Sequence, residues 1–227
     1  MHERFFFLDG TRGLAALAIL ALHFLDTINY SFIFPNTNVA VDFFFMLSGF
    51  VIAAAYEARI QRGDISFRHF LVIRFIRLYP LYAFGMTVGL AVGILKMLMM
   101  PNIAGEEIAT AYGLGLLLIP SNGWFGTVGL FPLNNPSWTL FFEIVFNIVF
   151  ILTVPVLRTI WIAAFVALSA AALFWVGHLH GPLGGETLDE IHTGFARVSF
   201  GFGAGVLVWR MQVQTWFRLP PVCAWVL

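Results

Sequence analysis

Charged side chains are scarce in this sequence. Asp, Glu, Lys and Arg together make up 11% of its 227 residues, whereas a soluble domain carries roughly 25% charged residues. Hydrophobic residue types make up 60%, too large a share for a chain that must cover a water-facing surface. The composition therefore excludes an ordinary soluble domain and predicts a polytopic membrane protein.

Three further absences narrow the class of protein. The net charge is zero, with 12 basic and 12 acidic residues, so we expect no nucleic-acid partner. Cys223 is the single cysteine, which excludes an internal disulfide and a metal site built from several cysteines. The first nine residues lack the basic region and cleavage site of a signal peptide. We therefore expect the first apolar run to stay in the product as a span.

Long apolar runs dominate what is present. Windows of about 20 apolar residues mark spanning helices, and the expected spans are residues 13–34, 39–56, 78–100, 109–119 (a shorter one), 138–157, 159–176 and 195–211. Residues 219–227 look like the opening of another span but are too short to cross. The sequence predicts an all-α transmembrane helix bundle of about seven spans plus a C-terminal stub, as one domain over residues 1–227.

Basic residues are concentrated between the second and third expected spans. Five of the twelve lie there, namely Arg59, Arg62, Arg68, Arg74 and Arg77. Because a Lys/Arg bias marks cytoplasmic loops, we expect this segment and the N-terminus in the cytoplasm, and a multi-pass protein of the inner (plasma) membrane.

Two arrangements of the later spans are open. If residues 109–119 cross once, Arg158, Arg210 and Arg218 lie outside. If residues 109–119 and 123–133 form a hairpin or re-entrant pair, the same arginines lie inside, which the positive-inside rule favours. The acidic segment 177–193 would then be a solvated outer loop, with His178 and His180 too poorly spaced to predict a metal site.

A histidine interrupts the first apolar run. Ionisable groups at membrane depth are costly and rare, so His23 is a functional candidate. Arg12 precedes it by eleven residues, about three helical turns, so the two would share a face roughly 16 Å apart. Asp26 would orient the imidazole as an acid does for a general base. The alternative is a capping arginine, a histidine bonded to a neighbouring helix, and a solvated Asp26.

Two arginines and a glutamate form further candidates. Arg74 and Arg77 are spaced i, i+3, which on a helix makes one cationic face suited to phosphate; the alternative is topology-setting charge attracted to anionic lipid. Glu143 follows Ser137, a candidate cap, by about two turns. A buried carboxylate needs a partner, which His23, Arg12 or an arginine of another span would supply.

The second expected span contributes supporting candidates. Asp42 lies near its outer end, and Ser48 and Gly49 lie deeper. Small residues of this kind permit close contact between membrane helices. We therefore expect a structural role for Ser48 and Gly49, and Asp42 as possible support for the site.

Taken in order, these residues resemble the motifs of the acyltransferase 3 family of integral membrane acyltransferases. Residues 8–15 look like its opening motif, and residues 41–52 are similar to its second-span motif. Arg12 and His23 resemble its Arg-x10-His signature, residues 74–77 its Arg-x-x-Arg motif, and residues 137–143 its Ser-Trp-x-Leu-x-x-Glu element. These elements occur in order over residues 8–150, and the rest of the chain fits only loosely.

The resemblance implies transfer of an acyl group, commonly acetyl, from cytoplasmic acyl-CoA to a hydroxyl. The acceptors are mainly sugars of surface polysaccharides, lipopolysaccharide or exported glycans. We expect no permanently bound cofactor or metal; the partners are acyl-CoA as donor substrate, a carbohydrate acceptor and the lipid bilayer. Family members typically have about ten spans, so we expect this chain to be C-terminally truncated relative to them.

A division of labour follows as a hypothesis. Arg74 and Arg77 would hold the CoA phosphates, and Arg12 would guide the pantetheine arm inward. His23 would act as general base or briefly carry the acyl group, and Glu143 would orient or charge-balance it. The alternatives are a transporter or channel with a buried ionisable relay, although the sequence has no internal repeat, or an inactive truncated family member.

Overall fold

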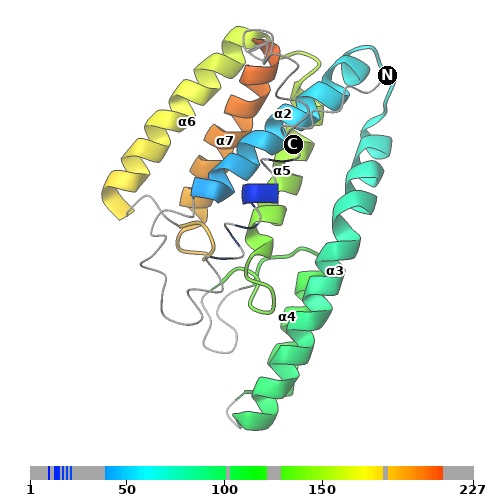
Figure 1. The fold of residues 1–227 in the computed structure, drawn as a ribbon, viewed down its shortest axis with the longest axis vertical. Helices are drawn as coiled ribbons and strands as arrows, with labels where there is room; N and C mark the ends of the chain where they lie inside the picture. Colours follow the sequence, from blue (N-terminus) through cyan, green and yellow to red (C-terminus); the bar gives the residue numbers. More distant parts are fainter. Residues whose placement is uncertain are drawn as a thin grey trace. The chain divides into compact units, whose positions relative to one another are not determined.

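The part of the chain that the structure describes is all-α. The computed structural model describes residues 39–100, 103–121, 129–180 and 184–211, with scattered positions between 10 and 21. Its helices are α2 (Val39–Gln61), α3 (Phe67–Met99), α4 (Gly105–Leu116), α5 (Ser137–Thr153), α6 (Thr159–His180) and α7 (Ile191–Arg210) (Figure 1). These stretches contain no strand, only an isolated bridge between Gly129 and Thr187. The predicted helical class is confirmed.

Four of the described helices are long and apolar enough to cross a membrane, namely α2, α3, α6 and α7. Helix α5 is a shorter apolar helix of 17 residues. Helix α4 has 12 residues and rises about 18 Å, well short of a hydrocarbon core of about 30 Å. By itself α4 is too short to cross, and the hairpin or re-entrant arrangement with residues 123–133 stays a prediction. Residues 22–34 of the first expected span and the segment 219–227 lie outside the described residues.

Helix α3 begins eleven residues earlier than the sequence suggested. Ser66 caps it, with its hydroxyl accepting from the backbone N–H of His69 at 3.3 Å. A span beginning at residue 78, as the sequence predicts, would place Pro80 in the first turn of the helix, but Pro80 lies inside the 33-residue helix. A proline removes only one backbone donor, and membrane helices tolerate that loss. Arg68, Arg74 and Arg77 therefore lie on α3 and not in a loop.

The first compact unit comprises Met1–Arg62, Pro155–Trp175 and Ala196–Leu227. Within it α2 and α7 lie side by side (Figure 1) and are joined by an ion pair near each end. Arg197 Nε lies 2.8 Å from Asp42 Oδ1, and Arg210 Nε lies 2.6 Å from Glu57 Oε1. Because one ion pair joins the two N-terminal ends and the other joins the two C-terminal ends, α2 and α7 run parallel.

Glycines bring α2 and α7 into backbone contact between these ion pairs. A Cβ added to Gly49 would lie 2.9 Å from the carbonyl carbon of Phe202, and one on Gly205 would lie 2.7 Å from the backbone nitrogen of Phe50. Real Cβ atoms essentially never come within 3.0 Å of such atoms. The close helix contact predicted at Gly49 is confirmed, and α7 is the partner helix.

The ends of this unit bear on the two arrangements of the later spans. Arg210 Nη1 donates to the backbone carbonyl of Leu157 at 2.5 Å, just before α6 begins. Arg158 and Arg210 therefore lie near the end of α2 that carries Glu57 and Arg59. The membrane side on which the later arginines lie stays a prediction.

The second compact unit comprises Gly63–Val154 and Val176–Phe195. The hydroxyl of Tyr79 donates to the carbonyl of Leu116 at 3.0 Å, and that of Tyr82 donates to the carbonyl of Gly115. Carbonyls in the last turn of a helix lack the usual i+4 donor; the Gly115 carbonyl also accepts from the Leu118 N–H at 2.7 Å. Helix α4 is thereby attached along α3.

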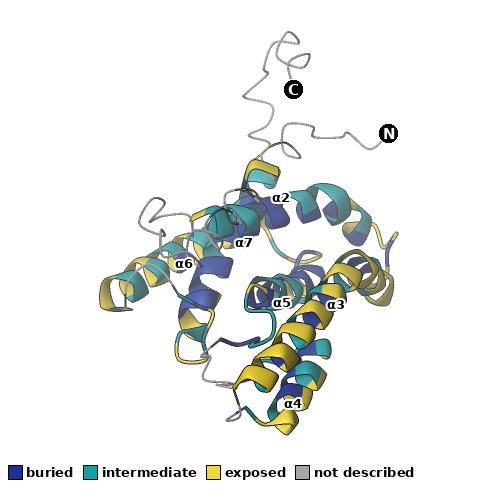
Figure 2. Ribbon diagram, turned by 60° about the horizontal axis from the view of Figure 1, so that its bottom comes forward, coloured by how far each residue is buried: buried dark blue, intermediate teal, exposed yellow. Residues whose placement is uncertain are grey.

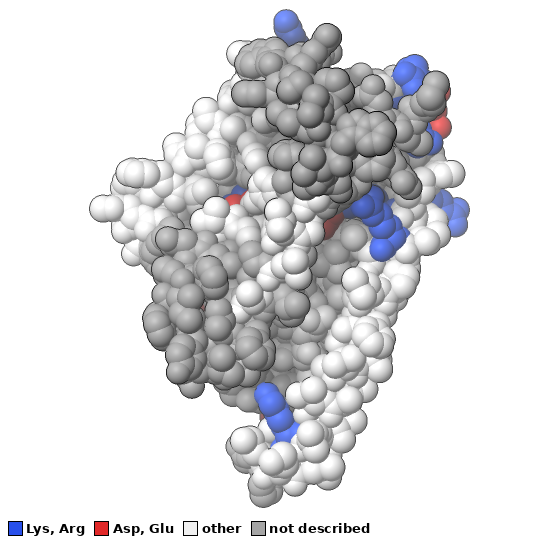
Figure 3. Space-filling view, viewed as in Figure 1, with Lys and Arg blue, Asp and Glu red and all other residues white. Residues whose placement is uncertain are grey.

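One face of α3 is exposed along most of its length, as Figure 2 shows, and the side chains on it are largely apolar. The exposed side chains include Leu81, Phe84, Val88, Val92 and Leu95. In a water-soluble protein such a stripe would be a liability, whereas in a bilayer it contacts lipid. The space-filling view in Figure 3 shows the same helix as mostly uncharged, with basic side chains toward its ends.

Candidate functional site

The central feature of the second unit is an ion pair between α3 and α5. Arg74 Nη2 donates to Glu143 Oε1 at 2.6 Å. The Arg74 side chain is 6% exposed and that of Glu143 is 22% exposed. A charge buried to this extent is costly unless it is paired. Of the partners that the sequence left open for Glu143, the structure places an arginine of another helix against it.

Aromatic packing on the face of α5 that points away from Arg74 determines the direction in which Glu143 points. The Phe142 ring is fully buried and meets the Phe195 ring edge-on with centroids 4.9 Å apart. Trp138 contacts Phe142 in the same way at 5.9 Å. Because Phe142 is held on this side, its neighbour Glu143 lies on a different face of α5, and that face meets Arg74.

The start of α5 differs in detail from the expectation. Ser137 was the candidate cap, but it is the first helical residue and Pro136 is the N-cap, with no side-chain cap bond. Thr139 Oγ1 instead donates to the carbonyl of Pro136 at 2.8 Å. The ring of Pro136 presets the backbone angle for helix entry, so the helix begins without a side-chain cap.

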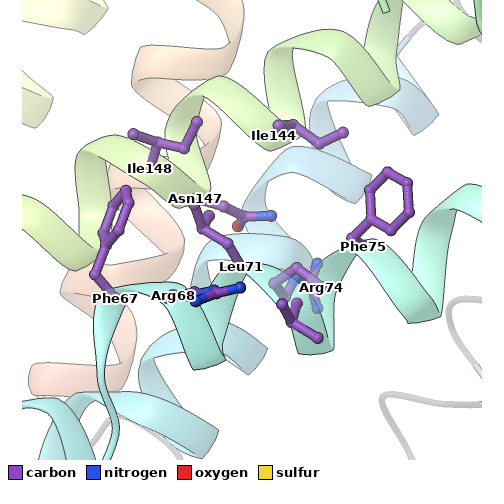
Figure 4. Close-up of a pocket in the computed structure, with 9 residues that line it drawn as sticks. Phe67, Arg68, Leu71, Arg74, Phe75, Ile144, Asn147 and Ile148 are labelled. Carbon is purple, nitrogen blue, oxygen red and sulfur yellow. The ribbon is translucent and has the colours of Figure 1, made fainter. Parts of the chain in front are cut away.

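A pocket of about 400 Å³ lies beside the ion pair and within the second unit. It is lined from α3 by Phe67, Arg68, Leu71, Val72, Arg74 and Phe75, and from α5 by Ile144, Asn147 and Ile148. Figure 4 shows Asn147 reaching from α5 toward α3, next to Leu71 and over Arg74. The accessible walls are almost wholly apolar, because Asn147 and Arg74 are themselves buried.

Asn147 is a residue that sequence reasoning missed. It is 1% exposed and follows Glu143 by four residues, which places both on one face of a helix. The signal in the sequence is a lone amide within the apolar run of residues 144–152. Hydropathy alone does not separate such a residue from a tolerated polar substitution.

The two arginines of the expected cationic face differ in environment. Arg74 is buried and bonded to Glu143, whereas Arg77 is exposed. An i, i+3 pair is about 60° apart around a helix axis, enough for one to point inward and the other outward. The structure therefore does not show the single outward cationic face, because Glu143 holds Arg74 inside.

The supporting candidates Asp42 and Ser48 belong to the first compact unit. Asp42 is paired with Arg197, a buried arginine that the sequence reasoning did not single out. Ser48 is buried in α2. Asp42 thus contributes to the α2/α7 interface as a structural ion-pair partner.

Arg12, His23 and Asp26 lie outside the described residues, so their shared helix face stays a prediction. The expected loop 177–193 is shorter than predicted, because α6 continues to His180 and α7 starts at Ile191. Between them, Glu186 Oε2 accepts from Asn135 Nδ2 at 2.8 Å, which ties this connection to the segment before α5.

Comparisons with known proteins agree with the motifs. The family model of the acyltransferase 3 type, described as an acyltransferase domain, matches residues 5–227. The chain is similar to "Protein 2 in picA locus" of Rhizobium radiobacter, with 39% identity over 158 residues, 65% of this chain and 81% of that protein.

A second relative carries an activity in its name. The chain is similar to acyltransferase MdmB of Streptomyces mycarofaciens, with 31% identity over 185 residues, 74% of this chain and 46% of that protein. The matched region therefore spans about half the length of MdmB. No solved structure matches the chain.

Proposed function

We propose that this chain, which belongs to the acyltransferase 3 family of membrane acyltransferases, transfers an acetyl group from cytoplasmic acetyl-CoA to a carbohydrate hydroxyl. The acceptor would be a sugar of a surface polysaccharide, lipopolysaccharide or exported glycan. The observation that carries the proposal is the contact between two family-like motifs. Arg74 of the Arg-x-x-Arg motif meets Glu143, the last residue of the Ser-Trp-x-Leu-x-x-Glu element, at 2.6 Å.

The proposed reaction is a direct acyl transfer. The acceptor oxygen bonds to the carbonyl carbon of the thioester, the carbon–sulfur bond breaks, and CoA leaves as the thiol. His23 accepts the hydroxyl proton, which then passes to the departing sulfur. A sugar hydroxyl is weakly acidic, and a positioned base typically contributes about 10²–10⁴-fold to the rate. Asp26 would hold the imidazole in the required orientation, and Arg12 would guide the pantetheine arm.

The ion pair in the second unit fits the donor end of this scheme. A guanidinium carries five N–H donors, so Arg74 can keep its bond to Glu143 and still donate to a phosphate. Glu143 would fix the direction of Arg74 and balance its charge. Arg77, exposed one turn further along α3, would supply a second contact to the diphosphate.

The test uses the full chain in lipid nanodiscs with radiolabelled acetyl-CoA. His23→Ala should abolish transfer to glycan and leave the melting temperature unchanged. The matched control is His178→Ala, which removes an exposed histidine of α6 and should change neither quantity. Unchanged transfer by the His23 variant would remove His23 from the reaction.

The acceptor is identified by mass analysis of surface glycans from cells with and without the intact gene. A loss of 42 mass units per modified sugar, roughly the mass of one acetyl group exchanged for hydrogen, would support O-acetylation. A folded wild-type chain that neither transfers acetyl nor hydrolyses acetyl-CoA would instead support an inactive family member. Proton-coupled solute uptake by the protein reconstituted into sealed lipid vesicles would support the transporter alternative.

A further inference from the structure

The pocket between α3 and α5 presents an almost wholly apolar surface to its surroundings. Three of the side chains that form its walls, Phe67, Val72 and Phe75, are 43%, 48% and 52% exposed. Figure 4 shows the two phenylalanines toward opposite ends of the pocket, with Ile144 and Ile148 of α5 across from α3. An aliphatic chain can contact such walls throughout, whereas a polar molecule would lose its hydrogen bonds to water there.

The polar side chains deep in the pocket are closed off from it. Arg74 and Asn147 are among its lining residues, but both are buried, and the Arg74 guanidinium is bonded to Glu143. Both polar atoms of the Asn147 amide are sealed from the pocket. A molecule bound there therefore lies over these side chains without a hydrogen bond to the amide, and any polar contact has to come from the rim.

Arg68 supplies a charge at the rim. It lines the pocket, is exposed and lies in the first turn of α3, which carries no acidic residue. The nine lining residues include no carboxylate, and no ion pair with another described residue compensates Arg68. The end of the pocket at the start of α3 is therefore positively charged, so a fitting molecule carries an anionic group there.

We infer that the pocket binds one acyl chain of an anionic phospholipid, with the headgroup phosphate against Arg68. The chain would lie in the pocket for about 12 Å, the helical rise from Phe67 to Phe75. A guanidinium can donate two parallel hydrogen bonds to phosphate oxygens. A zwitterionic headgroup would bring a cation near Arg68, so charge complementarity favours a headgroup that stays negative. The inference goes beyond acyl transfer and does not depend on it.

Binding in this pocket differs from ordinary contact with lipid. Lipid tails are as apolar as the walls, so the hydrophobic effect does not by itself hold a chain there. The site is distinguished by the fit of a chain between two helices together with a phosphate contact at one end. Leu81, Val88 and Leu95 of α3 are exposed and do not line the pocket, so residues 81–95 serve as the reference for ordinary lipid contact.

The experiment labels the full chain in phosphatidylcholine nanodiscs that contain a small fraction of photoreactive phosphatidylglycerol or, in parallel, photoreactive phosphatidylcholine. The diazirine is on the acyl chain, and mass spectrometry maps the labelled residues. We expect phosphatidylglycerol to label residues 67–75 and 144–148 about fivefold more strongly than phosphatidylcholine does, the effect of one basic residue near the membrane surface. Both lipids should label residues 81–95 equally.

Two pairs of variants make the test specific. Val72→Trp fills the pocket, and Val88→Trp is its matched control, because Val88 is also 48% exposed on α3 and does not line the pocket. Only Val72→Trp should abolish the excess labelling by phosphatidylglycerol. Arg68→Gln should lower that labelling to the level of phosphatidylcholine, whereas Lys96→Gln, which removes an exposed charge in the last turn of α3, should preserve the excess.

Each outcome supports or overturns the inference. Equal labelling of the pocket by the two lipids overturns it, as does an excess that survives Arg68→Gln. An excess that survives Val72→Trp places the lipid outside the pocket and overturns it as well. If Val72→Trp fails to fold, Arg68→Gln at its exposed position still decides. A pocket labelled by neither lipid overturns the inference and leaves a protein segment as the occupant, and none of these results bears on acyl transfer.

Discussion

The parallel contact of α2 and α7 depends on glycines, and Gly205→Ala tests it most directly. The added Cβ would lie 2.7 Å from the backbone nitrogen of Phe50 and 2.9 Å from the carbonyl carbon of Met46. Both atoms belong to the backbone of α2, so no side-chain rotation relieves the overlap. Ordinary contact for a Cβ begins at 3.4 Å. The carbonyl oxygen of Met46 lies closer to the added Cβ than the Phe50 nitrogen does, so relieving the overlap separates the helices by more than about 0.7 Å.

The expected cost follows from two opposing effects. Overpacking of this kind costs typically about 1–3 kcal/mol, and backbone obstruction places this site in the upper part of that range. Alanine in place of a helical glycine returns about 1 kcal/mol. The net loss of stability is therefore about 1–2 kcal/mol, which lowers the melting temperature of a chain of this size by about 2–8 °C.

The assay is thermal unfolding of purified protein in detergent, followed by tryptophan fluorescence. Gly113→Ala is the matched control, because nothing lies within 4 Å of a Cβ added there. It makes the same chemical change in α4 and should leave stability equal or raise it. A Gly205→Ala protein as stable as Gly113→Ala would refute the reasoning that glycine sets the distance between α2 and α7.

Three more substitutions test the second unit. Glu143→Gln removes one partner of a buried ion pair and should cost about 2–4 kcal/mol, less than the roughly 3–5 kcal/mol of a fully buried pair because Glu143 is partly exposed. The Arg74→Met/Glu143→Leu double variant should recover most of this stability. Both variants should lose acyl transfer. Tyr82→Phe should cost about 1 kcal/mol in thermal unfolding, because its hydroxyl donates to a carbonyl of α4. Gly89→Ala should destabilise by about 1–2 kcal/mol net, since its Cβ would lie 2.7 Å from the carbonyl carbon of Leu133 and alanine in a helix returns about 1 kcal/mol. Wild-type melting of the Tyr82 or the Gly89 variant would contradict the contact concerned.

The sequence predicted those described helices whose positions depend on hydropathy alone. Helices α2, α6 and α7 occur close to the expected ranges, because burial in lipid requires about 20 apolar residues whatever the neighbouring helices are. Helix α3 was predicted too short, because a hydropathy window detects only the part of a helix that is apolar enough to lie in lipid. It does not detect where backbone hydrogen bonding begins. Its first turns carry arginines that lower the score, although Ser66 caps a helix there.

The candidate site was predictable as a set of residues but not as an arrangement. The sequence identified Arg74 and Glu143 separately and left three kinds of partner open for the carboxylate. The two residues are 69 positions apart, and no local pattern relates positions at that distance. Asn147 was missed for the same reason, because its significance depends on which helix α5 faces.

What the sequence determined by itself is the medium and the chemistry of this protein. Scarcity of charge requires a bilayer, the apolar runs require helices, and spaced motif residues indicate the family. The tertiary structure decided which charges are paired, which arginine points inward, and where a pocket opens beside an amide. The physical reason is that hydropathy and helix formation act on neighbouring residues, whereas pairing and cavity formation depend on contacts between residues far apart in the chain.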